Sequence, residues 1–198
     1  MSLSSKIILG IDPGSLQMGY AVLQTGRSSL QVLEMDTLKM SGRNNAYTRL
    51  QLIHEKVSAI IETYRPDCLA IEAPFFGKNV QSMLKLGRAQ GIAIGAALQK
   101  NLPIFEYAPR RVKQAITGNG NAQKEQVWKM LRQTLSLSTQ DFRSFDASDA
   151  LAVALCHYYE EKKPFASTKK GGKDWKTFLE QHPGRIVQDP KKIRKTHS

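Results

Sequence analysis

The chain has few cysteines and no long apolar run. These two absences argue against a disulfide-rich, zinc-binding or membrane-spanning protein. Only two of its 198 residues are cysteine, Cys68 and Cys156, and they form no CxxC pair. Isolated cysteines in apolar segments predict reduced core thiols rather than a disulfide framework or a zinc site. No segment approaches the roughly 20 apolar residues that span a membrane, and the first residues lack the apolar core of a signal peptide. We therefore expect a cytoplasmic protein with no membrane association.

The sequence also lacks the common nucleotide-binding loops. Neither GxxxxGK[ST] nor a GxGxxG that opens a helix is present. The turn Asp12-Pro13-Gly14-Ser15 is similar to the phosphate turn of actin-like and sugar-kinase ATPases. Those proteins need two such domains and a second phosphate loop, for which this chain is too short, so the ATPase interpretation is not favoured.

Negative charge is scarce, which indicates a polyanionic partner. The chain has 29 Lys and Arg against 17 Asp and Glu, a net charge of +12. Residues 162–198 alone hold 11 basic and 3 acidic residues, so this stretch carries +8 and residues 1–161 carry only +4. We expect one folded domain over 1–161 and a basic C-terminal tail over 162–198, in which 174–182 has the pattern of a short helix. Nucleic acid is the first candidate partner; a solubility extension is the alternative for the tail.

The hydrophobic pattern predicts an α/β fold. The first three predicted strands are joined by short turns and indicate an antiparallel meander, whereas the later strands alternate with helices and indicate parallel pairing. We therefore expect a mixed sheet flanked by helices. The predicted strands are 6–12, 19–24, 30–39, 68–71 and 103–107, and the predicted helices are 46–64, 80–100, 110–117, 124–135 and 146–159.

Four acidic residues stand where a buried strand ends or a helix begins. Asp12 follows one apolar strand and Glu72 another, while Asp146 and Asp149 share one face in the first turn of a helix. A lone carboxylate beside a buried strand is costly to desolvate. A divalent cation such as Mg²⁺, which prefers carboxylate oxygens, would offset that cost for several acids at once.

Each acid has a structural alternative. Asp12 precedes Pro13-Gly14 and could simply form a turn, and acids such as Asp146 and Asp149 favour helix N-termini. Glu72 is harder to explain in this way, because Glu rarely ends a buried strand. Together in a basic chain, the four acids favour an enzyme that cleaves phosphodiesters with two Mg²⁺ ions.

Several sequence blocks occur in a characteristic order. They are ILGIDPGS at 8–15, AIEAPF at 70–75, GKN at 77–79, LKLG at 84–87, PIFEY at 103–107, VKQ at 112–114 and DASDALA at 146–152. Together these blocks resemble the RuvC family of Holliday-junction resolvases, and the resemblance covers about residues 7–157. It implies a ribonuclease H-like fold, a homodimer, and Mg²⁺-dependent paired symmetric nicking of four-way junction DNA in recombination and repair. It also implies a partner, a branch-migration complex of the RuvA and RuvB type.

The resemblance also implies roles for individual residues. The acids fall on the family's catalytic and metal-binding positions, with Mg²⁺ as the metal and Mn²⁺ as a substitute; Lys124 matches a further catalytic position. Phe75 matches the aromatic residue thought to act at the opened centre of the junction. The implied catalytic residues are Asp12, Glu72, Asp146, Asp149 and Lys124, and the implied DNA-binding residues are Phe75, Lys78, Lys113 and Lys124.

Three features depart from the family or stay open. Pro74 and Phe76 stiffen and enlarge the loop after Glu72, residues 136–145 match no known block, and the tail has no counterpart. The Ala- and Gly-rich helix at 80–100 indicates close packing, either against the sheet or in a dimer contact. Two other functions stay open: a ribonuclease H-like nuclease acting on RNA or an RNA–DNA hybrid, and a non-catalytic nucleic-acid-binding module.

Overall fold

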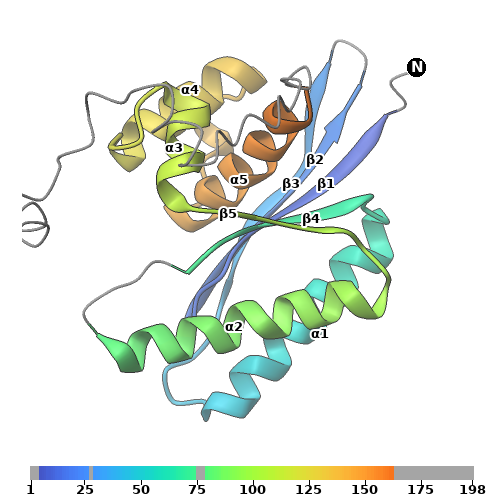
Figure 1. Ribbon diagram of the computed structural model, residues 1–198, viewed down its shortest axis with the longest axis vertical. Helices are drawn as coiled ribbons and strands as arrows, with labels where there is room; N and C mark the ends of the chain where they lie inside the picture. The colour runs from blue at the N-terminus through green and yellow to red at the C-terminus, as the bar shows by residue number, and fades with distance from the viewer. Residues whose placement is uncertain (1–4, 27–28, 75–78, 163–198) are drawn as a thin grey trace, which may run out of the picture. The chain divides into compact units, whose positions relative to one another are not determined.

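A five-stranded mixed sheet lies between two layers of helices (Figure 1). The computed structural model describes residues 5–26, 29–74 and 79–162. The strand order is β3-β2-β1-β4-β5, with antiparallel pairing from β1 to β3 and parallel pairing of β4 with both β1 and β5. This confirms the predicted meander and parallel strands. The strands are β1 (Lys6–Asp12), β2 (Gln17–Thr25), β3 (Leu30–Lys39), β4 (Cys68–Glu72) and β5 (Ile104–Tyr107).

The helices divide between the two faces of the sheet, as Figure 1 shows. One face carries α1 (Ala46–Tyr64) and α2 (Val80–Gln99). The other face carries α3 (Pro109–Thr117), α4 (Lys124–Leu135) and α5 (Phe145–Lys162), and a short 3-10 turn, Thr139–Asp141, joins α4 to α5. Each face has its own hydrophobic core.

The alternation of side chains along β1 and β4 explains why two cores form. Leu9 and Ile11 of β1 pack with α1 and α2, whereas Ile8 packs with α5 on the opposite face. Because successive side chains point to opposite faces, Gly10 and Asp12 share the α5 side with Ile8. The same period places Glu72 on the α5 side, two residues beyond Ala70.

Two glycines allow α5 to approach the sheet closely. A Cβ added to Gly10 of β1 would lie 2.2 Å from the carbonyl oxygen of Ala150, and one added to Gly19 of β2 would lie 1.9 Å from that of Asp146. No side chain can be accommodated at such distances. The N-terminal half of α5 is therefore seated directly on β1 and β2, which brings the first turn of α5 to the end of β1.

Several boundaries differ from the predicted ones by a few residues. β2 begins at Gln17 rather than 19, and α5 runs from Phe145 to Lys162 rather than 146–159. The last turns of α5 are partly exposed and polar, so the apolar pattern did not reveal them. Cys68 and Cys156 are both buried, as predicted, and neither forms a disulfide. Within the described ranges, no helix combines the length and apolarity needed to cross a membrane. The predicted tail helix lies outside the described residues.

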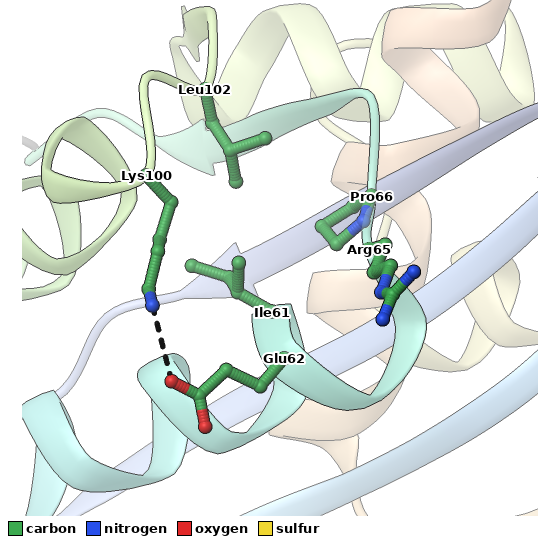
Figure 2. Close-up of a pocket in the computed structure, with 6 residues that line it drawn as sticks. All are labelled: Ile61, Glu62, Arg65, Pro66, Lys100 and Leu102. Carbon is green, nitrogen blue, oxygen red and sulfur yellow. Dashed lines mark hydrogen bonds and ion pairs between the residues drawn. The ribbon is translucent and has the colours of Figure 1, made fainter.

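A cavity lies at the opposite end of the parallel strands from Asp12, and Figure 2 shows the side chains that line it. Its volume is about 440 Å³, and the ion pair between Lys100 Nζ and Glu62 Oε1, at 3.1 Å, borders it. The lining comes from the segments that lead into β4 and β5. Ligands of open α/β sheets bind instead beyond the carboxyl ends of the strands. The residues that line this cavity are Ile61, Glu62, Arg65, Pro66, Lys100 and Leu102.

Candidate metal centre

Asp12 and Glu72 lie side by side at the carboxyl ends of two neighbouring strands. In the parallel pairing of β1 with β4, Ile11 is opposite Ile71, so the next residue on each strand ends the pair. Both acidic side chains are half-buried and lie on the α5 side of the sheet. The sequence pattern thus places two carboxylates at one sheet edge through strand register alone.

Helix α5 supplies two more carboxylates to the same edge. Asp146 is in its first turn and Asp149 follows one turn later. Ligand oxygens of Asp12, Asp146 and Asp149 all lie within 4.8 Å of one another. Glu72 is not part of this group of three, but its charge acts on Asp12. The structure therefore gathers all four predicted acids at one end of the sheet, with three of them close enough to share one ion.

Burial and mutual repulsion disfavour negative charge at this cluster. Burial raises the pKa of Asp12 to about 8, and the nearby charges of Glu72, Asp149 and Asp146 contribute to the rise. Burial, followed by the charge of Asp149, raises the pKa of Glu72 to about 7. The pKa of Asp149 is also raised, again mainly by burial. Such a cluster favours a cation that neutralises it.

Lys124 supplies one positive charge to this cluster. It is the first residue of α4, and its Nζ lies 2.8 Å from Asp149 Oδ2. Burial lowers the pKa of Lys124, but the hydrogen bond and charge of Asp149, with Asp12 and Asp146, raise it overall. The charge of Lys113, in α3, also lowers the pKa of both Glu72 and Asp149. Both predicted lysines in the described ranges therefore act electrostatically on the acids.

Two of the predicted DNA-binding residues, Phe75 and Lys78, lie outside the described residues.

The four histidines took no part in the predicted site. Among them His157 is buried in α5, where its Nδ1 is 2.8 Å from the hydroxyl of Tyr107 and its ring lies 4.2 Å from that of Phe105. These contacts give His157 a packing role in the fold.

One contact at the site was not foreseen from sequence. Gln90 of α2 is only 7% exposed, and its Nε2 donates a hydrogen bond to Glu106 Oε2 at 2.8 Å and a longer one, 3.5 Å, to the carbonyl oxygen of Glu72. The side chain therefore joins α2 to the ends of β4 and β5. The sequence feature that could have revealed this contact is a single Gln on the otherwise Ala-rich buried face of α2.

The donor set fits a divalent metal ion that prefers oxygen ligands. Asp12, Asp146 and Asp149 offer converging carboxylate oxygens, and no His or Cys belongs to this group. Hard cations such as Mg²⁺ and Mn²⁺ choose such donors, whereas zinc sites use mainly His and Cys. The raised pKa values also indicate a cation site. Part of the rise comes from repulsion among the carboxylates, and a bound cation would remove that repulsion.

Comparison with known proteins adds a second, independent line of argument. A family model described as "Crossover junction endodeoxyribonuclease RuvC" matches residues 8–157. The chain is 52% identical over 182 residues to the crossover junction endodeoxyribonuclease RuvC of Bacteroides fragilis, which covers 91% of this chain and 96% of that protein. Identity to the same enzyme of Porphyromonas gingivalis is 47% over 190 residues, with 94% and 100% covered.

The fold is similar to a solved structure described as T. thermophilus RuvC in complex with Holliday junction substrate. The TM-score is 0.74 at 34% sequence identity, covering 79% of this chain and 94% of that one. The likeness confirms the ribonuclease H-like mixed sheet that the sequence predicted.

Proposed function

Because this chain belongs to the RuvC family of crossover junction endodeoxyribonucleases, we propose that it resolves four-way DNA junctions by paired, symmetric, Mg²⁺-dependent nicks. The observation that carries this proposal is the convergence of Asp12, Asp146 and Asp149 within 4.8 Å at the carboxyl end of β1. A nuclease needs such a cluster for its metal ions, whereas a module that only binds nucleic acid does not.

We propose that the four acids hold two metal ions, with Mn²⁺ able to replace Mg²⁺. Asp12 is close enough to the other three acids for their charges to raise its pKa, so it would be the ligand shared by both ions. Glu72 would hold one ion from β4, and Asp146 and Asp149 would complete the sphere from α5. Bound Mg²⁺ would supply an activated water and neutralise charge on the leaving 3′-oxygen.

Lys124 has a separate task in this proposal. Its ammonium already contacts Asp149, so it can hold that carboxylate in place and reach a phosphate next to it. Lys113, on the neighbouring helix, would bind the DNA backbone close to the acids. Phosphate contacts of this kind give affinity without reading sequence. Phe75 and Lys78, together with the +8 tail, are proposed DNA contacts on sequence grounds alone.

We further propose that the protein acts as a homodimer through the open face of α2. Gly87, Gly91 and Gly95 recur every fourth residue, and a Cβ added to any of them would meet nothing within 4 Å. Val80, Leu84 and Leu98 are exposed on the same helix. Glycines at this spacing allow two helix backbones to approach closely, and a two-fold dimer would present two metal centres to the two equivalent strands of a junction.

A substrate panel tests the proposed function. Purified protein would be incubated with a synthetic four-way junction, a linear duplex of the same sequence and an RNA–DNA hybrid, each with Mg²⁺ or with a chelator. We expect nicking of the junction alone, and only with Mg²⁺. Cleavage of the hybrid in preference to the junction, or binding to the junction without any cleavage, would contradict the proposal.

A branch-migration complex in the cytoplasm remains the proposed partner by family membership.

A further inference from the structure

A row of aromatic side chains leads away from the metal centre along the segment between α4 and α5. It begins at Lys124, whose Nζ lies 5.9 Å from the ring centre of Phe145. The ring centres of Phe145 and Phe142 are 5.2 Å apart, and those of Phe142 and Trp128 are also 5.2 Å apart. Since Lys124 also contacts Asp149, the row is continuous with the acids.

Phe142 is the exposed member of this row. Its exposed fraction is 37%, whereas Trp128 and Phe145 are half-buried beneath it. The two supporting rings meet Phe142 at interplanar angles of 59° and 73°. Rings in such tilted or edge-on contacts support one another, and the exposed part of Phe142 remains available to a further ring.

The segment that carries Phe142 is held firmly at both ends. On one side the backbone N–H of Ser138 donates to Asp141 Oδ2 at 2.6 Å. On the other, the hydroxyls of Ser144 and Thr37 are 2.5 Å apart, and Ser144 Oγ also accepts from the N–H of Ala147 at 3.0 Å. The phenyl ring is therefore presented from an ordered position and needs little further ordering on binding.

Positive charge accompanies the exposed ring. Arg143 follows Phe142, is exposed, and forms no salt bridge with any other residue in the described part of the chain. A surface aromatic ring with an adjacent guanidinium is the combination that single-stranded or opened nucleic acid requires: a platform for a base and a donor for a phosphate. An apolar protein partner would not need the arginine.

We infer that Phe142 and Arg143 form a DNA contact beside the metal centre, and this inference rests on the proposed function. The ring of Phe142 packs on a base that becomes accessible where the arms of the junction separate, and Arg143 binds a phosphate of the same strand. Because the row begins at Lys124 and Asp149, the contacted nucleotides flank the scissile phosphate. The pair therefore positions the strand for cleavage, in addition to the residues that the family resemblance implies.

Matched variants separate this role from a purely structural one. Phe142→Ala is compared with Phe105→Ala, because Phe105 is 38% exposed and also packs on another ring, that of His157, away from the acids. Arg143→Gln is compared with Arg65→Asn, which removes a positive charge at the cavity of Figure 2. Asn is chosen because Arg65 has a left-handed backbone, with φ 47°, and Asn tolerates this conformation. Thermal unfolding of all four variants measures the stability loss.

Junction affinity and photocross-linking give the deciding readouts. We expect Phe142→Ala to weaken junction binding about tenfold, with Phe105→Ala unchanged, and Arg143→Gln to reduce the slope of log affinity against log salt by about 0.9, with Arg65→Asn unchanged. Junctions carrying 5-iododeoxyuridine next to the nick site should cross-link to Phe142 in a cleavage-inactive Asp12→Asn protein.

Three results would contradict the inference. Equal binding by Phe142→Ala and wild type, in a wild type that nicks junctions, overturns it and leaves the proposed function standing. Absence of nicking by the wild type overturns the proposed function, and the inference falls with it. A Phe142→Ala protein that loses affinity only as much as Phe105→Ala also overturns the inference, because the loss then follows stability.

Discussion

The ammonium of Lys124 lies 2.8 Å from the carboxylate of Asp149, so a protein cation already occupies one side of the acidic cluster. The two side chains come from different helices, α4 and α5. This contact makes the chemistry of the site depend on the packing of those helices, and it affects Asp149 directly because the charge of Lys124 lowers the pKa of that carboxyl against the effect of burial.

Removing the charge of Lys124 should shift the pH dependence of cleavage. In Lys124→Gln the pKa of Asp149 rises further, so a higher pH is needed before this ligand is ionised. We expect the acidic limb of the pH profile to move to higher pH, and the rate at the optimum to fall by about 100-fold. Single-turnover cleavage at saturating junction and Mg²⁺ measures both. Lys124→Arg, which keeps the charge, should retain the wild-type limb; an unchanged profile in Lys124→Gln would contradict the assignment.

Raising the pH should destabilise the metal-free protein. The folded-state pKa values of Asp12 and Glu72, about 8 and about 7, lie above those of the unfolded chain. The folded state therefore binds more protons between about pH 4 and pH 8, and the free energy of unfolding falls as the pH rises through this window. Asp12→Asn carries no charge and should be more stable than wild type at pH 8.5 by at least about 1 kcal/mol.

Urea unfolding at pH 6 and pH 8.5, with and without Mg²⁺, checks this prediction. Mg²⁺ should restore the stability that the wild type loses at pH 8.5 and should have little effect on Asp12→Asn, which lacks the bridging ligand. A wild-type protein with the same stability at both pH values in the absence of metal would show that burial and mutual repulsion do not raise the pKa values of these carboxylates.

Gln90 should act on metal binding through Glu72. Its amide joins α2 to Glu106 and to the backbone of Glu72, so Gln90→Leu removes a support at the end of β4. We expect about tenfold weaker binding of Mn²⁺, measured by calorimetry in the absence of DNA. Glu106→Gln, whose amide oxygen can still accept the hydrogen bond, should bind metal nearly as well as wild type, whereas Glu106→Ala should resemble Gln90→Leu. Identical affinities in all variants would leave Gln90 with a packing role only.

A bulky side chain on the open face of α2 should separate the proposed dimer. Gly91→Leu adds a side chain where the fold itself leaves open space, and replacing a helical Gly should stabilise the helix by up to about 1 kcal/mol. Sedimentation velocity should therefore show a folded monomer. Gly42→Leu is the matched control, because Gly42 also has nothing within 4 Å but lies in a turn. A dimer in Gly91→Leu would place the interface elsewhere.

The secondary-structure elements and the four acidic site residues could be predicted from the sequence because local residue patterns encode both. Strand 30–39 and helices 46–64 and 124–135 have the predicted bounds, and the period of two along β1 and β4 places Asp12 and Glu72 on one face. The contacts of Lys124 with Asp149 and of Gln90 with Glu106 could not be predicted, since each joins elements whose packing is set by the whole fold. The close seating of α5 likewise depends on Gly10 and Gly19 meeting residues more than 100 positions away.

Paired cutting by a metal centre is the central claim, and a supercoiled plasmid that extrudes a cruciform tests it most directly. Wild-type protein with Mg²⁺ should convert the plasmid to linear molecules, because both nicks fall within the lifetime of one complex, and Asp12→Asn should bind the cruciform without cutting it. Accumulation of nicked circles by the wild type would contradict paired cutting. Cleavage by Asp12→Asn at the wild-type rate would contradict the metal centre itself.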